Sequence, residues 1–141
     1  MLTQTLTTSF KREILEGVHN FLTDTFKIAL YTSSATLGPN TLVYTVLGEV
    51  TPQGTYAAGG QVLTGTILST GSGVAYVTFN NLTWTSVTFT ARGALIYNSS
   101  KGNKSVAVYN FGTDQTAGAL DVFNITTVSY THLTLPTILR V

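Results

Sequence analysis

Apolar residues near the beginning of the chain recur at the spacing of one helical face. They occupy six positions, namely Phe10, Ile14, Leu15, Val18, Phe21 and Leu22. A stripe at i, i+4 and i+8 is typical of an amphipathic helix that packs by one side. Residues 9–22 are therefore predicted to form a helix capped by Ser9, and Gly17 is expected to weaken this helix without ending it.

After this helix the hydrophobic period changes to two. Thr25–Ser33 is predicted to be a strand because its side chains alternate, with Phe26, Ile28 and Leu30 on one face and Lys27, Ala29 and Tyr31 on the other. Six further short strands are predicted at 61–69, 74–80, 87–92, 94–98, 105–111 and 120–126. Turns rich in Gly, Asn and Ser are expected between them at 70–73, 80–81, 99–103 and 112–118.

This succession of strands predicts the fold class. Many short strands separated by Gly and Asn turns are typical of an antiparallel sandwich or barrel. The hairpin at 94–111 has the clearest pattern, since turn residues separate two alternating runs. We expect a mainly β protein, an antiparallel β-sandwich of Greek-key or jelly-roll-like type with one N-terminal α-helix.

The length of 141 residues suits a single domain. We place this domain at residues 9–127 and expect residues 1–8 to be a flexible N-terminal segment. Only 9% of the residues are charged, with 7 Lys and Arg against 6 Asp and Glu. No basic cluster could follow a nucleic-acid backbone, so nucleic acid is not an expected partner. A surface poor in charge favours contact with other proteins, because charge normally keeps small domains apart.

Other broad classes are also disfavoured. No apolar run approaches the ~20 residues that cross a bilayer, so no membrane association is expected. The first residues have neither the charged nor the apolar region of a signal peptide. Cysteine is absent, which excludes disulfides and thiolate chemistry.

The end of the chain has a different character. Residues 128–137 read VSYTHLTLPT, a string that resembles the translation of a transposon-end sequencing adaptor, as found in reading frames assembled from environmental DNA. Residues 128–141 are accordingly interpreted as a non-native tail, and the native C-terminus beyond about residue 127 is not defined by this sequence.

Side chains suited to catalysis are few. His19 is the one histidine before the tail, and a lone histidine on an amphipathic helix is expected to be a surface or boundary residue. Glu13 and Glu16 lie three positions apart and are expected to line the solvated face of the same helix. No nucleophile motif, phosphate-binding loop or set of metal ligands is recognisable. We therefore expect no catalytic, cofactor-binding or metal site and no enzyme activity.

Aromatic side chains offer the remaining candidate contacts. Trp84 lies in the run NLTWTS, and Tyr44 and Tyr56 lie in irregular stretches that contain Gly. Tyr and Trp are favoured at interfaces because they combine apolar area with a polar group. Tyr44, Tyr56 and Trp84 are therefore predicted to form a possible interaction surface, although most aromatic residues in strands belong to a core.

Several segments of the chain carry a family resemblance. They are residues 9–15, 24–37, 54–60, 90–98 and 102–108, which include DTFKIALYTSSATL and TARGALIYN. Together they resemble a family of small proteins of tailed bacteriophages, found in aquatic viral metagenomes and described as hypothetical or virion structural proteins. The resemblance covers residues 9 to about 125 and implies no catalytic residue.

The resemblance and the composition together lead to a functional hypothesis. We expect a non-enzymatic virion structural protein, assembled in the cytoplasm of the host bacterium, that forms homo-oligomers and contacts major capsid or tail proteins. A head decoration protein that stabilises the capsid is favoured. The alternative is a tail or tail-fibre-associated protein, such as a receptor- or carbohydrate-binding module with Trp84 as a stacking platform. A small cell-wall hydrolase is a distant third.

Overall fold

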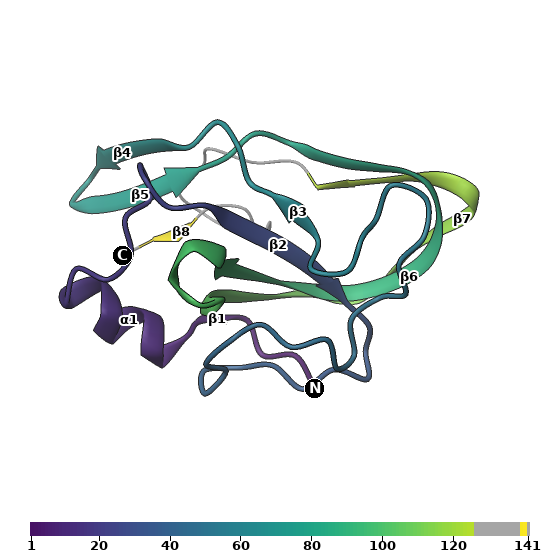
Figure 1. The fold of residues 1–141 in the computed structure, drawn as a ribbon, viewed down its shortest axis with the longest axis horizontal. Helices are drawn as coiled ribbons and strands as arrows, with labels where there is room; N and C mark the ends of the chain where they lie inside the picture. Colours follow the sequence, from purple (N-terminus) through teal and green to yellow (C-terminus); the bar gives the residue numbers. More distant parts are fainter. Residues whose placement is uncertain (126–138, 141) are drawn as a thin grey trace.

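The protein is built from antiparallel strands and one α-helix, as Figure 1 shows for a computed structural model that describes residues 1–125, 139 and 140. In chain order, its elements are β1 (Thr5–Leu6), α1 (Thr8–Leu15), β2 (Phe26–Tyr31), β3 (Gln61–Val62), β4 (Ile67–Gly71), β5 (Val74–Thr78), β6 (Leu82–Asn98), the 3-10 turn η1 (Ser99–Lys101), β7 (Lys104–Ile125) and β8 (Leu139–Arg140). The prediction of a mainly β, antiparallel fold with an N-terminal α-helix is confirmed.

The strands form two sheets. The larger sheet has the order β1-β7-β6-β2-β3 and the smaller one the order β4-β5-β8, and every pairing between neighbours is antiparallel. The predicted hairpin at 94–111 is present where β6 and β7 meet around η1. Gly102 and Asn103 close this turn with positive φ angles of 68° and 60°, which glycine and asparagine tolerate best.

The core lies on both faces of the larger sheet. Phe26, Ile28 and Leu30 of β2 face a large cluster that also contains Phe10 of α1 and Trp84 of β6. The alternate residues of β2 face a smaller cluster, formed by Leu2, Ala29, Tyr31, Ala35, Leu37, Leu95, Tyr97 and Val108. The predicted alternation of β2 is therefore correct, and both of its faces are buried.

The N-terminal residues differ from the prediction of a flexible segment outside the domain. Leu2 is buried in the smaller cluster, and β1 pairs with β7 in the larger sheet. The Thr3 N–H donates to the Leu37 carbonyl and the Thr7 N–H to the Val106 carbonyl. The burial of Leu2 and these backbone hydrogen bonds make the N-terminal segment part of the folded domain. Its polar composition does not indicate this.

The helix is shorter than predicted. It begins at Thr8 with Thr7, not Ser9, as the cap, since the Thr7 hydroxyl accepts a bond from the Phe10 N–H. It ends at Leu15 because Gly17 adopts a φ of +75°. The N–H groups of Gly17 and Val18 then donate to the carbonyls of Ile14 and Glu13, the bonding pattern of a Schellman motif. Gly17 therefore ends the helix, contrary to the prediction.

Strands β6 and β7 are longer than predicted and pair from Leu82–Ile125 to Asn98–Lys104. The predicted turn at 112–118 is part of β7, so this prediction is wrong. The register shifts between Ala91 and Gly93, where Phe111 to Asp114 form a bulge and Gly112 has a φ of +85°. Gly112 bends β7 but does not end it, because β7 remains paired with β6 on both sides of the bulge.

Most of the predicted non-native tail, residues 128–141, lies outside the described residues. The exceptions are Leu139 and Arg140, whose backbones pair with Val77 and Tyr76 of β5. Within the part of the chain that the structure describes, no helix is long and apolar enough to cross a membrane.

Candidate interaction surface

The three aromatic residues predicted to form an interaction surface do not lie together on the surface. Trp84 is 1% exposed and Tyr56 is 2% exposed, and both belong to the large core cluster. Their rings contact each other at a centroid distance of 5.7 Å. The prediction is wrong for these two residues because the 50–60 segment folds back onto β6, where the Thr55 N–H donates to the Thr85 carbonyl.

Tyr44 is half-buried and belongs to a network around Glu49. Its ring stacks on Tyr97 at 4.8 Å, and its hydroxyl donates to Glu49 Oε2 at 2.6 Å. Glu49 Oε1 accepts from the Tyr56 hydroxyl at 2.7 Å and from the Gly59 N–H at 2.8 Å. The carboxylate therefore links the irregular segments on its two sides, and the Tyr56 hydroxyl, which also accepts from the Leu30 N–H, ties them to β2.

The tyrosine hydroxyls of this network remain protonated. Burial, reinforced by the nearby Glu49 carboxylate, raises the pKa of Tyr97 to about 12. The same two causes raise the pKa of Tyr44 and Tyr56 above the ordinary value. Each hydroxyl is therefore a fixed donor at neutral pH, and the Tyr97 hydroxyl donates to the Gly59 carbonyl at 2.6 Å. The network holds the loop that contains Tyr44 in one position.

That loop, residues 41–47 and here called the apolar loop, presents the exposed hydrophobic side chains of Leu42, Val43, Val46 and Leu47, which are 48% to 77% exposed. It is bonded to the start of β7, since the Tyr44 N–H donates to the Asn103 carbonyl and the Ser105 N–H to the Leu42 carbonyl. A loop fixed at its base with four aliphatic groups in solvent is typical of a protein contact site.

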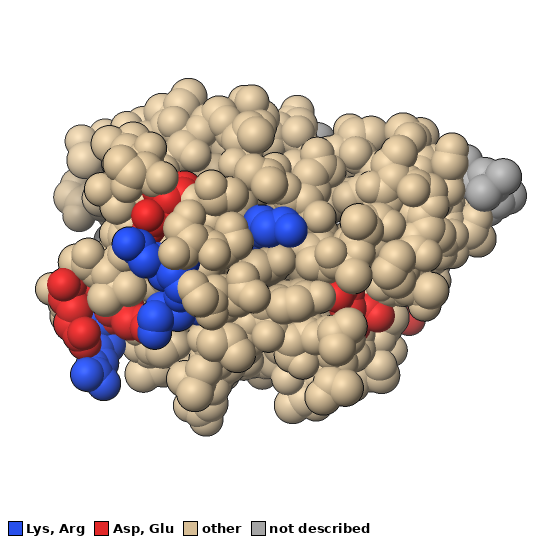
Figure 2. All heavy atoms as spheres, in the orientation of Figure 1, with Lys and Arg blue, Asp and Glu red and all other residues tan. Residues whose placement is uncertain are grey.

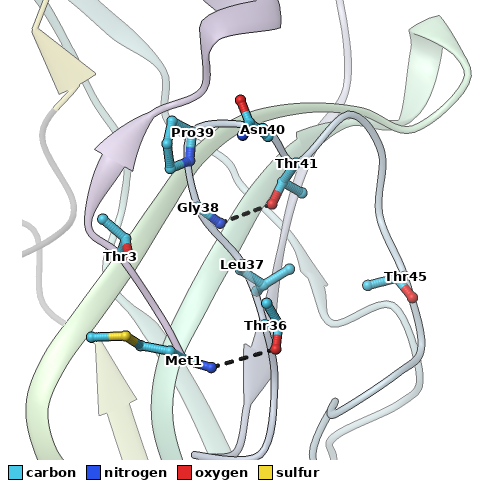
Figure 3. A pocket seen from close by; sticks show the side chains of 9 residues that line it. All are labelled: Met1, Thr3, Thr36, Leu37, Gly38, Pro39, Asn40, Thr41 and Thr45. Carbon is cyan, nitrogen blue, oxygen red and sulfur yellow. Dashed lines mark hydrogen bonds between the residues drawn. The ribbon is translucent and has the colours of Figure 1, made fainter.

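A pocket of about 490 Å³ adjoins the apolar loop. Figure 3 shows its lining residues, which come from the N-terminal segment, the 36–41 turn and Thr45. The Met1 ammonium donates to Thr36 Oγ1 and to the Ala35 carbonyl, and the Gly38 N–H donates to Thr41 Oγ1. All of the side chains that line the pocket are uncharged. Together with the apolar loop they form one candidate interaction surface without side-chain charges.

Charged groups gather at the end of the molecule that carries α1, as Figure 2 shows by the concentration of blue and red atoms there. The apolar loop borders this end, since Leu42 lines a pocket together with Arg12, Glu16 and Lys104. His19 lies at this end but is buried, with a side chain that is 0% exposed, so the prediction of a surface or boundary position is wrong. Glu13 is also largely buried and contacts His19 Nε2 at 3.2 Å and Lys104 Nζ at 2.8 Å. Of the predicted solvated pair, only Glu16 is exposed.

Asn98 completes this polar network, which consists of Glu13, His19, Asp24, Asn98, Lys101 and Lys104. Its Oδ1 accepts from the Ser100 N–H, and its Nδ2 donates to Asp24 Oδ2 at 2.8 Å. Nδ2 lies 3.1 Å from His19 Nδ1 and therefore donates there as well. His19 must then carry its proton on Nε2, which donates to Glu13.

This arrangement fastens the segment after α1 to the tip of the β6–β7 hairpin. The His19 ring is also enclosed by Phe10 and Phe26, with centroid distances of 5.0 and 6.3 Å. A substrate cannot reach an imidazole whose two nitrogens are bonded and whose faces are covered. Among the described residues, no group of three or more His, Asp and Glu side chains is arranged to hold a metal ion.

Sequence reasoning missed both networks and the apolar loop. The loop had a visible signal in the run LVYTVL, which places four aliphatic residues close together in an irregular segment. The polar network had none, because His19 and Asn98 are 79 positions apart. Comparisons with protein-family models, curated proteins and solved structures found no significant match to this chain.

Proposed function

We propose that the protein is a non-enzymatic structural component of a bacteriophage particle, and that it decorates the head. The observation that carries this proposal is the apolar loop, with four aliphatic side chains held in solvent by backbone bonds to β7. Exposed apolar groups on a fixed loop gain free energy when a partner surface covers them. The bacteriophage context comes from the family resemblance described above.

In this role the protein acts by binding and performs no reaction. Many copies cover boundaries between capsid subunits, and each copy buries its apolar loop against the major capsid protein. Binding to the assembled state alone stabilises that state by mass action. The pocket beside the loop has no charged side chain in its lining, which suits a surface that loses its water, because buried charges need partners.

A carbohydrate-binding role is less favoured. Stacking on a sugar needs an exposed aromatic face, and Trp84 and Tyr56 are buried against each other. Trp84→Ala is therefore expected to unfold the protein and not to remove a binding function selectively.

Immunogold labelling of virus particles tests the proposal. The particles come from a cultured phage that encodes a close relative, and the antibody is raised against the folded chain. Gold distributed over the heads is the expected result. Gold confined to tails would replace head decoration with a tail role. Particles without gold would refute a virion component, provided that the same antibody binds the purified native protein in solution.

A further inference from the structure

Strand β4 lies at an edge of the smaller sheet and pairs only with β5 among the described residues. The two strands are joined by Ser72 and Gly73, both with positive φ, as a two-residue type I′ turn requires. In such a hairpin the pairs Gly71–Val74, Ser69–Tyr76 and Ile67–Thr78 exchange the backbone hydrogen bonds. The backbone N–H and C=O groups of Leu68 and Thr70 therefore point away from β5, toward the open edge.

This edge lacks the usual protection against pairing. Natural edge strands carry lysine, proline or inward-pointing charges that oppose the approach of another strand. No Asp, Glu, Lys or Arg occurs between Glu49 and Arg92, and β4 contains no proline. Ile67 and Leu68 are exposed at 60% and 49%. Neither charge repulsion nor a missing backbone N–H group therefore opposes the pairing of another strand with β4.

The hydrogen-bonding groups of β4 are complementary to a second β4. We propose that β4 pairs antiparallel with β4 of a second copy of this chain, with Ser69 on the two-fold axis. In this register Leu68 of each copy exchanges both backbone hydrogen bonds with Thr70 of the other. Ser69 then faces its own counterpart, and Ile67 of each copy lies across from Gly71 of the other. The small side chains at Ser69 and Gly71 leave room for this approach.

The second copy is the favoured occupant because the pairing is self-complementary. An isologous contact satisfies the open edges of both copies at once and so limits growth to a dimer at this edge. An apolar pocket lined in part by Leu68, Val77, Ile14 and Phe21 adjoins β4, so a second copy paired at β4 would have apolar side chains beside it. This proposal does not depend on the virion role, since it concerns the purified chain alone.

Charge reversal at the axis tests this pairing. The mass of the full chain in solution is measured by sedimentation equilibrium as a function of concentration. Wild type is expected to dimerise, and Ser69→Lys and Ser69→Glu are each expected to weaken dimerisation by at least about tenfold, because like charges then face each other. An equimolar mixture of the two variants should form a heterodimer. Ser33→Lys, an exposed position in the turn after β2, is the matched control and should dimerise as wild type does.

Three results would overturn the proposal. The first is a wild-type chain that stays monomeric up to millimolar concentration. The second is undiminished dimerisation of both Ser69 variants. The third is a mixture of the two variants that stays monomeric although each variant retains the wild-type circular dichroism spectrum and unfolding midpoint. The mixture keeps the test decisive, since misfolded variants could not restore the dimer.

Discussion

The α1 end and the β4–β5 hairpin use charge in opposite ways. At the α1 end, Glu13 and Asp24 are largely buried and bonded to Lys104, His19 and Asn98. The β4–β5 hairpin has no charged residue, and Ile67 and Leu68 remain exposed. Buried charges therefore fasten separate segments together at the α1 end, whereas the β4–β5 hairpin leaves uncharged, apolar side chains in solvent.

The contrast also concerns how each region is anchored. The long-range bonds of the polar network join residues that are 74 to 91 positions apart, which holds the hairpin tip against α1 and the segment after it. In the hairpin of β4 and β5, Val77 contributes a side chain to the large core, and the backbone of β5 pairs with β8. Removal of a polar side chain at the α1 end should therefore destabilise the protein far more than removal of one in the β4–β5 hairpin.

Among changes to these two regions, the largest effect is expected for Asn98→Ala. The substitution leaves the Asp24 carboxylate, His19 Nδ1 and the Ser100 N–H without the partner that now serves all three. Unpaired buried groups are costly, so the free energy of unfolding should fall by about 2 to 4 kcal/mol. Denaturant unfolding measures this change. The matched variant Asn110→Ala, in β7 beside the bulge, removes an amide that bonds the Leu2 carbonyl and the Gly112 N–H nearer the surface. A smaller loss for Asn98→Ala than for Asn110→Ala would contradict the role of the network.

The second largest effect is expected from lowering the pH, which should destabilise the α1 end. Burial alone raises the pKa of Glu13, but hydrogen bonds from Lys104 and His19 outweigh it and lower the pKa below the ordinary value of 4.5. Burial also raises the pKa of Asp24, and bonds from Asn98 and the Asn20 N–H again outweigh it. Both carboxylates thus stabilise the fold fully above their ordinary pKa values, and this contribution is lost as the pH falls through the lower folded values.

Unfolding midpoints measured between pH 7 and pH 2 check this dependence. Wild type should lose stability as the pH falls below about 4. The double variant Glu13→Gln/Asp24→Asn should show a flatter profile, whereas Glu16→Gln should follow the wild-type profile because Glu16 is exposed. Parallel curves for all three proteins would show that the network does not cause the acid sensitivity.

The smallest effect is expected for the exposed ion pair of Arg12 and Glu16 on α1. Pairs of this kind at i and i+4 contribute about 0.3 to 0.5 kcal/mol and are screened by salt. Glu16→Gln should therefore change the unfolding free energy by less than about 0.5 kcal/mol. A loss of more than about 1 kcal/mol would mean that α1 depends on this surface pair and not on its buried face.

The sequence predicts some of these features and not others, for physical reasons. The alternation of β2 and the β6–β7 turn follow from local patterns of side-chain size and turn chemistry. The end of α1 was missed because Val18, Phe21 and Leu22 continue the helical spacing, although Gly17 has already turned the chain. Phe21 still reaches the core, from a turn and not from a helix.

The site was less predictable than the fold. An aromatic residue in a strand or loop can be buried or exposed depending on what folds over it, and Trp84 and Tyr56 cover each other. The polar network depends on contacts between distant segments, which no local pattern contains. The apolar loop could have been suspected from four aliphatic residues in a short irregular run, but its exposure depends on how Glu49 and β7 hold it.

The central claim is that the apolar loop is the surface by which the protein binds a capsid. The most direct test compares two exposed leucines, Leu47 in the loop and Leu15 at the end of α1, which are 77% and 89% exposed. Phage particles that carry Leu47→Ser or Leu15→Ser in this protein are purified, and the copies bound per particle are measured by quantitative mass spectrometry. Leu47→Ser should lower the bound copies at least severalfold, and Leu15→Ser should leave them unchanged. Equal occupancy of both variants, or a loss with Leu15→Ser alone, would contradict the claim.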